Sequence, residues 1–130
     1  MHGCVPDSSP VALLLIDVIN DMEFPGGDKL LRHALPAAQK ILKLKEQARK
    51  HGIPSIYVND NFGRWRSDFH QQVDRCLGED LRGSEIARML VPREEDYFVL
   101  KPKHSAFHYT TLDVLFKHVG ATTLIITGFA

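Results

Sequence analysis

The sequence has little cysteine, no excess of either charge and no long apolar run. Two cysteines in 130 residues, Cys4 and Cys76, do not make the disulfide framework of a small secreted domain. Sixteen basic side chains balance sixteen acidic ones, so no broad field favours nucleic acid or an anionic membrane. The longest apolar run, residues 11–16, is far shorter than the roughly 20 residues of a membrane-spanning helix. We therefore expect a cytoplasmic protein in a reducing compartment, with no nucleic-acid and no membrane partner.

The remaining composition is typical of one globular domain. The apolar fraction is 44% and the charged fraction 25%. A chain of this length can bury roughly two thirds of the surface that it exposes when unfolded. Residues 1–10 are polar and lack the basic start and apolar centre of a signal peptide. We expect an N-terminal tail over residues 1–10 and one domain over residues 11–130.

Apolar runs and helical patterns alternate along that domain. Strands are expected at residues 11–16, 53–60, 96–100 and 123–127, and helices at residues 28–51, at residues 84–90 after a Ser cap, and from Thr110 or Thr111 to a stop at Gly120. Pro36 lies inside the first helical pattern, so this helix either spans the pattern or begins near Pro36 after a lead-in turn. Residues 61–80 are expected to be a long polar connection. The alternation predicts βαβ crossovers and a parallel sheet.

Three expected strands end in chemically distinctive residues: Asp17, Lys101 and the turn Gly128-Phe129-Ala130. Ligands of open parallel sheets bind beyond the carboxyl ends of the strands. A partly desolvated Asp17 can act as a base, or it can cap the following turn, where Asn20, Asp21 and Glu23 are expected to be structural. Lys101 can hold an anion or activate a nucleophile, or its stem can lie along the sheet edge. Spacing alone does not decide between Lys101 and Lys103.

Two connections contain candidate substrate-binding residues. Ser105 and Phe107 suit the wall of a substrate pocket, because a small residue is followed by a ring. Arg64 and Trp65 can bind an anionic or planar substrate by ion pairing and stacking, or they belong to a solvated loop. Both connections are expected to lie near the strand ends.

Four motifs, LLLIDVINDMEFPGG, YVNDNFGRWRSDF, VLKPKHSAF and LIITGFA, together resemble the isochorismatase-like cysteine hydrolases. This superfamily includes nicotinamidases and N-carbamoyl-amide hydrolases. The resemblance extends from about Val11 to the last residue, and it depends on the order and spacing of the motifs. It implies an α/β, three-layer Rossmann-like fold with a parallel sheet flanked by helices. It also implies hydrolysis of a small molecule at an amide or carbamoyl C–N bond, and assembly as a homodimer or homotetramer.

The family catalyses with an Asp, a Lys and a Cys. By resemblance Asp17 is the acid, and Lys101, which lies four residues before Ser105, is the lysine. The bond between Phe129 and Ala130 corresponds to a cis peptide, and the amide after it contributes to the family's oxyanion hole.

The nucleophilic cysteine is expected four residues beyond Ala130. Neither Cys4 nor Cys76 stands at a matching position. We therefore expect that the chain lacks the C-terminal part of the domain and is inactive alone.

Metal and cofactor are not expected. Members of the nicotinamidase type bind a divalent ion through an Asp and nearby histidines after the second strand. Asp60 fits the acid, but Phe62 stands where a His is expected, and His70 is the one histidine of that connection. His104 and His108 have the spacing of metal ligands on a helix, but Pro102 argues against a helix there.

Two alternatives remain from other functional classes. A response-regulator receiver domain has a similar length and pattern, but its phospho-accepting Asp follows the third strand, where this chain has Lys101. A non-catalytic relative that acts by oligomerisation is the second alternative, because the nucleophile is absent from the sequence.

Overall fold

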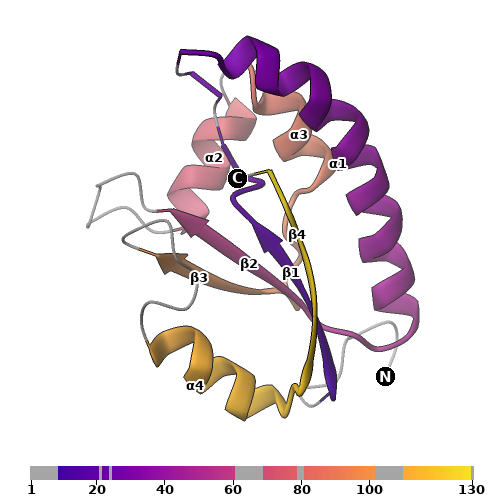
Figure 1. The fold of residues 1–130 in the computed structure, drawn as a ribbon. Helices are drawn as coiled ribbons and strands as arrows, with labels where there is room; N and C mark the ends of the chain where they lie inside the picture. Colours follow the sequence, from indigo (N-terminus) through magenta and orange to yellow (C-terminus); the bar gives the residue numbers. More distant parts are fainter. Residues whose placement is uncertain are drawn as a thin grey trace.

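The computed structural model describes residues 9–20, 22–23, 25–60, 69–78, 81–101 and 110–129, and these form an α/β fold (Figure 1). In chain order the elements are β1 (Val11–Ile16), α1 (Gly27–Lys50), β2 (Ser55–Asp60), α2 (Phe69–Gly78), α3 (Ser84–Met89), β3 (Tyr97–Lys101), α4 (Thr110–Val119) and β4 (Thr123–Gly128). This alternation of strands and helices confirms the predicted fold class. No helix in the described ranges is long and apolar enough to cross a membrane.

The strands form one parallel sheet in the order β3-β2-β1-β4. β1 is central, since it pairs with β2 on one side and with β4 on the other. Its residues 12–15 are wholly buried, and such an uninterrupted apolar run is typical of a strand that is covered on both faces. Of the described strands, β3 and β4 form the two edges.

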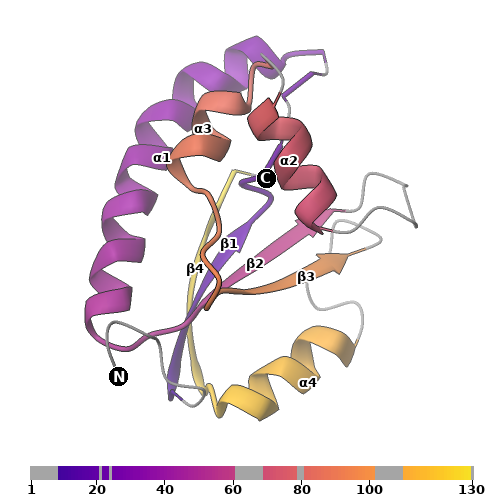
Figure 2. The same ribbon diagram turned by 180° about the vertical axis from the view of Figure 1, so that it is seen from behind.

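Helices cover both faces of the sheet, so the fold has three layers (Figures 1 and 2). Alternate residues of β1 point to opposite faces. Leu13 and Leu15 pack in the cluster that contains residues of α1, α2 and α3, whereas Ala12 and Leu14 pack in the cluster that contains residues of α4. The helix α4 thus lies alone among the described helices on the second face.

Pro36 does not delay the start of α1. The helix is continuous from Gly27 to Lys50, so the lead-in turn that we considered before Pro36 is wrong. An interior proline removes one hydrogen bond and crowds the preceding turn, at a cost of about 3 kcal/mol. Pro36 lies on the exposed side of α1, while Ala34, Ala38 and Ile41 are buried against the sheet. The packing of this apolar side outweighs the local cost.

The predicted connection over residues 61–80 contains a helix that sequence reasoning missed. α2 occupies Phe69–Gly78, and its Val73 and Cys76 are buried in the core. Their spacing of three residues was the available signal, but the polar residues around them hid it. The predicted Ser cap of the next helix is also wrong: Ser84 is the first residue of α3, and its Oγ accepts a hydrogen bond of 2.9 Å from the amide of Leu81.

A buried polar network fixes α1 to the sheet. The Nζ of Lys45 lies 2.7 Å from Oδ2 of Asp96, just before β3, and donates a 2.8 Å hydrogen bond to Oη of Tyr57 in β2. The Tyr57 hydroxyl donates in turn to the carbonyl of Leu90 at 2.7 Å. Burial, and then the charge of Asp96, raise the pKa of Tyr57 far above its ordinary value. The network joins α1, β2 and the residues that follow α3.

Candidate functional site at the switch point of the sheet

The carboxyl ends of β1 and β4 form the topological switch point of the sheet. From β1 the chain crosses to β2 and then β3 on one side, whereas β4 lies on the other side of β1. The helices α1 and α4 lie on opposite faces of the sheet (Figures 1 and 2). Open α/β sheets bind ligands in the crevice at such a point. The pairing of β1 with β4 ends at Ile16 and Gly128, so Asp17 and Phe129 follow at the same level.

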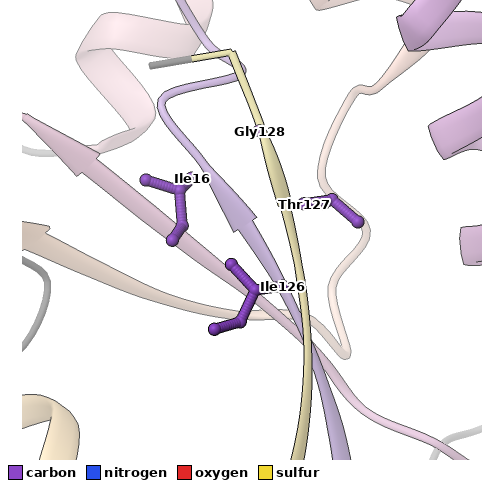
Figure 3. A pocket seen from close by; sticks show the side chains of 4 residues that line it. All are labelled: Ile16, Ile126, Thr127 and Gly128. Atoms are coloured by element: carbon purple, nitrogen blue, oxygen red, sulfur yellow. The ribbon is translucent and has the colours of Figure 1, made fainter.

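An open hollow of about 330 Å³ lies between these two strand ends, lined by Ile16, Ile126, Thr127 and Gly128 (Figure 3). The side chains of Ile16 and Ile126 point to the same side of the sheet, and Thr127 points to the other side. There the Thr127 hydroxyl donates a 2.7 Å hydrogen bond to the carbonyl of Leu14. The volume is in the range of small-molecule sites, about 300–1,000 Å³.

Gly128 ends β4 in a backbone conformation that other residues rarely adopt. Its φ is 146°, and a Cβ at this position would overlap the carbonyl oxygen of Ile16. Glycine therefore permits the close approach of the β1 and β4 ends. Phe129 follows and packs, partly buried, on the cluster of the α1 face. Ala130 lies outside the described residues, so the cis peptide and the oxyanion hole stay predictions.

Asp17 begins a strained turn after β1. We call residues 17–20 and 22–23 the Asp17 segment. Within it Asp17 has φ 55° and Met22 has φ 59°, both in the left-handed region. Such a conformation costs a non-glycine residue about 1–3 kcal/mol and persists only where surrounding structure holds it. The amide of Asp17 donates a 2.8 Å hydrogen bond to the carbonyl of Val58, which ties the segment to β2.

Side chains hold the Asp17 segment from two sides. From β2, Nδ2 of Asn59 donates to the carbonyl of Ile19 at 2.8 Å, and within the turn Oδ1 of Asn20 accepts from the amide of Met22 at 2.8 Å. The structural role that we expected for Asn20 is thus confirmed. No sequence pattern singled out Asn59, because its position at the end of a strand did not reveal that its side chain is completely buried.

On the second side the Asp17 segment is held by Arg82, which precedes α3. Nη1 of Arg82 donates to the carbonyl of Met22 at 3.3 Å, and the amide of Arg82 donates to Oε2 of Glu23 at 3.0 Å. This contact confirms the structural role expected for Glu23. Gly27 at the start of α1 completes the packing, since a Cβ there would overlap the carbonyl oxygen of Met22. The backbone around Asp17 is therefore held by β2, by α1 and by the residues before α3.

Lys101 is the last residue of β3 and lies at the carboxyl end of the sheet, as Asp17 does. The pairing Ile16–Val58 and Val58–Val99 puts the carboxyl ends of β1, β2 and β3 side by side. Lys101 pairs with Asp60, and only the backbone of these two residues is described. The convergence of the Lys101 ammonium with the Asp17 carboxylate stays a prediction. The other predicted site residues lie outside the described residues: Arg64, Trp65, Ser105 and Phe107, together with Lys103.

The one described cysteine is a core residue. Cys76 is 4% exposed and packs in the cluster on the α1 face. A thiol buried among apolar groups is typical of a structural cysteine, whereas catalytic cysteines lie in electropositive and partly exposed surroundings. This placement fits the expectation that Cys76 is not the family's nucleophile.

The chain is similar in sequence to known proteins over most of its length. A model of the isochorismatase domain matches residues 11–130. The uncharacterized isochorismatase family protein YaaI of Bacillus subtilis (strain 168) is 40% identical over 119 residues, which cover 92% of this chain and 65% of YaaI. The present chain thus spans about two thirds of the length of this relative.

Solved structures show the same fold. An isochorismatase family protein from Desulfovibrio vulgaris aligns with a TM-score of 0.64 and 26% identity, over 92% of this chain and 66% of that one. The N-carbamoylsarcosine amidase from Thermoplasma acidophilum aligns with a TM-score of 0.57 and 25% identity, over 92% and 68% of the two chains. On the match of the domain model and these likenesses, the chain belongs to the isochorismatase family.

Proposed function

We propose that the complete protein is a cysteine hydrolase that cleaves an amide or carbamoyl C–N bond of a small molecule. The observation that carries the proposal is the position of Asp17, in a strained turn held from two sides at the switch point of the sheet. Families of this fold place reacting groups at such strand ends. The likeness to an N-carbamoylsarcosine amidase supports the choice of a C–N bond.

In the proposed mechanism Asp17 takes the proton of a cysteine thiol, and the Lys101 ammonium stabilises the resulting charges. We expect this cysteine four residues beyond Ala130, as the family pattern implies. The thiolate attacks the carbonyl carbon, and the amides that follow Phe129 hold the oxyanion. Asp17 returns the proton to the departing nitrogen, which leaves a thioester at the cysteine. Water then hydrolyses the thioester and regenerates the thiol.

The proposal includes neither metal nor cofactor, because the residues named supply both the base and the charge stabilisation. We also propose that the complete protein is cytoplasmic and forms a homo-oligomer.

Ammonia release tests the proposal. The protein expressed from its complete gene is incubated with N-carbamoylsarcosine and with a panel of other N-carbamoyl compounds and primary amides. Asp17→Asn should lower kcat about 10²–10⁴-fold, the usual contribution of a general base. Asp28→Asn is the matched control, because Asp28 is an exposed acid in the first turn of α1.

Two results would contradict the mechanism. One is an Asp17→Asn variant that releases ammonia as fast as the Asp28→Asn control. The other is thiol-dependent activity of the chain of 130 residues alone, abolished by Cys76→Ser. We expect that this chain alone shows no such activity.

A further inference from the structure

Asn59 has a buried carboxamide side chain, of which the NH₂ group makes a described hydrogen bond and the oxygen does not. The residue is completely buried at the carboxyl end of β2, and its Nδ2 donates to the carbonyl of Ile19 at 2.8 Å. Its Oδ1 has no hydrogen-bond partner in the part of the chain that the structure describes. A buried acceptor without a partner destabilises the folded state, because it has lost water and gained nothing. An apolar side chain of similar size would fill the same space without this penalty.

The bond that Asn59 does make is directed at the turn that contains Asp17. Two consecutive residues of β2 contact this turn: Val58 accepts the amide of Asp17 through its carbonyl, and Asn59 holds the carbonyl of Ile19 through its side chain. The residue between the two attachment points, Val18, is completely buried. Residues of β2 therefore hold the strained backbone at the amide of Asp17 and again at the carbonyl of Ile19, two residues further on.

We propose that Asn59 is a positioning residue for Asp17. Its Nδ2 holds the backbone of the Asp17 segment in the strained conformation that it has at the carboxyl end of β1. The proposal rests on the proposed function only for its catalytic consequence, since the hydrogen bond and its local effect exist whether or not Asp17 acts as a base.

Amide hydrogen exchange of the chain tests the local effect. The variants are Asn59→Leu, which removes the carboxamide, and Asn59→Asp, which keeps its shape but cannot donate when ionised. Tyr57→Phe is the matched control, because Tyr57 is also completely buried, lies in the same strand and loses its hydrogen bonds with Lys45 and Leu90, which do not involve the Asp17 segment. Exchange is followed at the amides of Asp17 and Leu13.

The amide of Asp17 reports on the carboxyl end of β1, and that of Leu13 on the middle of the strand. The amide of Asp17 is bonded to the carbonyl of Val58, and that of Leu13 to the carbonyl of Pro54, at 2.8 and 2.9 Å. In both Asn59 variants we expect exchange at Asp17 to accelerate about tenfold or more relative to Leu13, because a local opening has become easier. In Tyr57→Phe the ratio between the two amides should stay the same.

Equal acceleration at both amides in the Asn59 variants would overturn the proposal, and so would no acceleration at Asp17. If neither Asn59 variant folds while Tyr57→Phe does, Asn59 supports the whole fold and the positioning role is also wrong. The two variants differ in charge, so a defect of Asn59→Asp alone reports the buried charge and counts against the proposal.

A kinetic readout separates this proposal from the proposed function. In the protein from the complete gene, Asn59→Leu should lower kcat for the hydrolysed amide about tenfold or more at nearly constant KM, because proton transfer and not substrate binding is impaired. Full kcat in Asn59→Leu would contradict positioning. If no substrate is hydrolysed but exchange changes as expected, positioning stands and the proposed hydrolase activity is wrong.

Discussion

The buried pair of Lys45 and Asp96 gives the strongest stability prediction. Their side chains are 8% and 5% exposed, and Nζ lies 2.7 Å from Oδ2. Oδ2 of Asp96 also accepts the amide of Arg93 at 2.8 Å. The variant Asp96→Ala would remove both contacts. It leaves the ammonium of Lys45 buried with the hydroxyl and the ring of Tyr57, a neutral side chain, as its remaining described contacts.

A buried charge that loses its partner costs about 3–5 kcal/mol. The whole free energy of unfolding of a domain is about 5–15 kcal/mol, so Asp96→Ala should bring the protein close to unfolding. The double variant Lys45→Met/Asp96→Leu removes both charges together. Because the Tyr57 hydroxyl still donates to the carbonyl of Leu90, this double variant should lose no more than about 2 kcal/mol.

Urea denaturation followed by circular dichroism measures these free energies of unfolding. The matched control is Arg49→Ala, since Arg49 pairs with Glu95 at 3.0 Å between the same parts of the structure but is 39% exposed. We expect Arg49→Ala to cost less than about 1 kcal/mol. A loss in Asp96→Ala as small as that of Arg49→Ala would refute the reasoning, and so would a double variant that loses the sum of its single changes.

Three further predictions concern other parts of the fold. Gly27→Ala should lower the free energy of unfolding by about 1–3 kcal/mol, because its Cβ would overlap a backbone carbonyl oxygen; Gly78→Ala, with open space around it, should be neutral or stabilising, and equal losses in urea titrations would contradict this. The raised pKa of Tyr57 gives a contribution to stability that is complete below about pH 10 and is lost at higher pH. Above that pH the free energy of unfolding should therefore fall less steeply with pH in Tyr57→Phe than in the unchanged protein. Identical slopes would show that burial does not raise the pKa of this tyrosine. The exposed Ile126 on the edge strand should promote self-association of the chain, and Ile126→Lys should shift sedimentation toward monomer; an unchanged distribution would exclude this strand as the contact.

The four described strands and their parallel sheet were predictable, because each strand has a clear apolar signature and helical patterns separate them. The apolar run at β1 is typical of a strand that is covered on both faces, and its residues 12–15 are completely buried. The stop of α4 at Gly120 was also correct, since this glycine has φ 74°. By contrast, Pro36 and the polar residues around Val73 gave local signals against helix that packing on the sheet overrode.

The candidate site was predictable only in its location. The rule for strand ends placed Asp17 and Lys101 at the carboxyl end of the sheet, and the observed topology has the backbone of both residues there. The contacts of Asn59 and Arg82 with the Asp17 segment were not predictable, because they join residues about 40 and 60 positions apart through side chains. Periodicity reports which face a residue occupies, but not which distant carbonyl group its side chain meets.

The central claim is that Asp17 and Lys101 serve one nucleophilic cysteine. A crystal structure of the polypeptide encoded by the complete gene tests it most directly. We predict a cysteine four residues beyond Ala130 whose Sγ lies within about 4 Å of the Asp17 carboxylate and the Lys101 ammonium, with a cis bond before Ala130. A different residue at that position, or a Lys101 side chain directed away from Asp17, would contradict the claim.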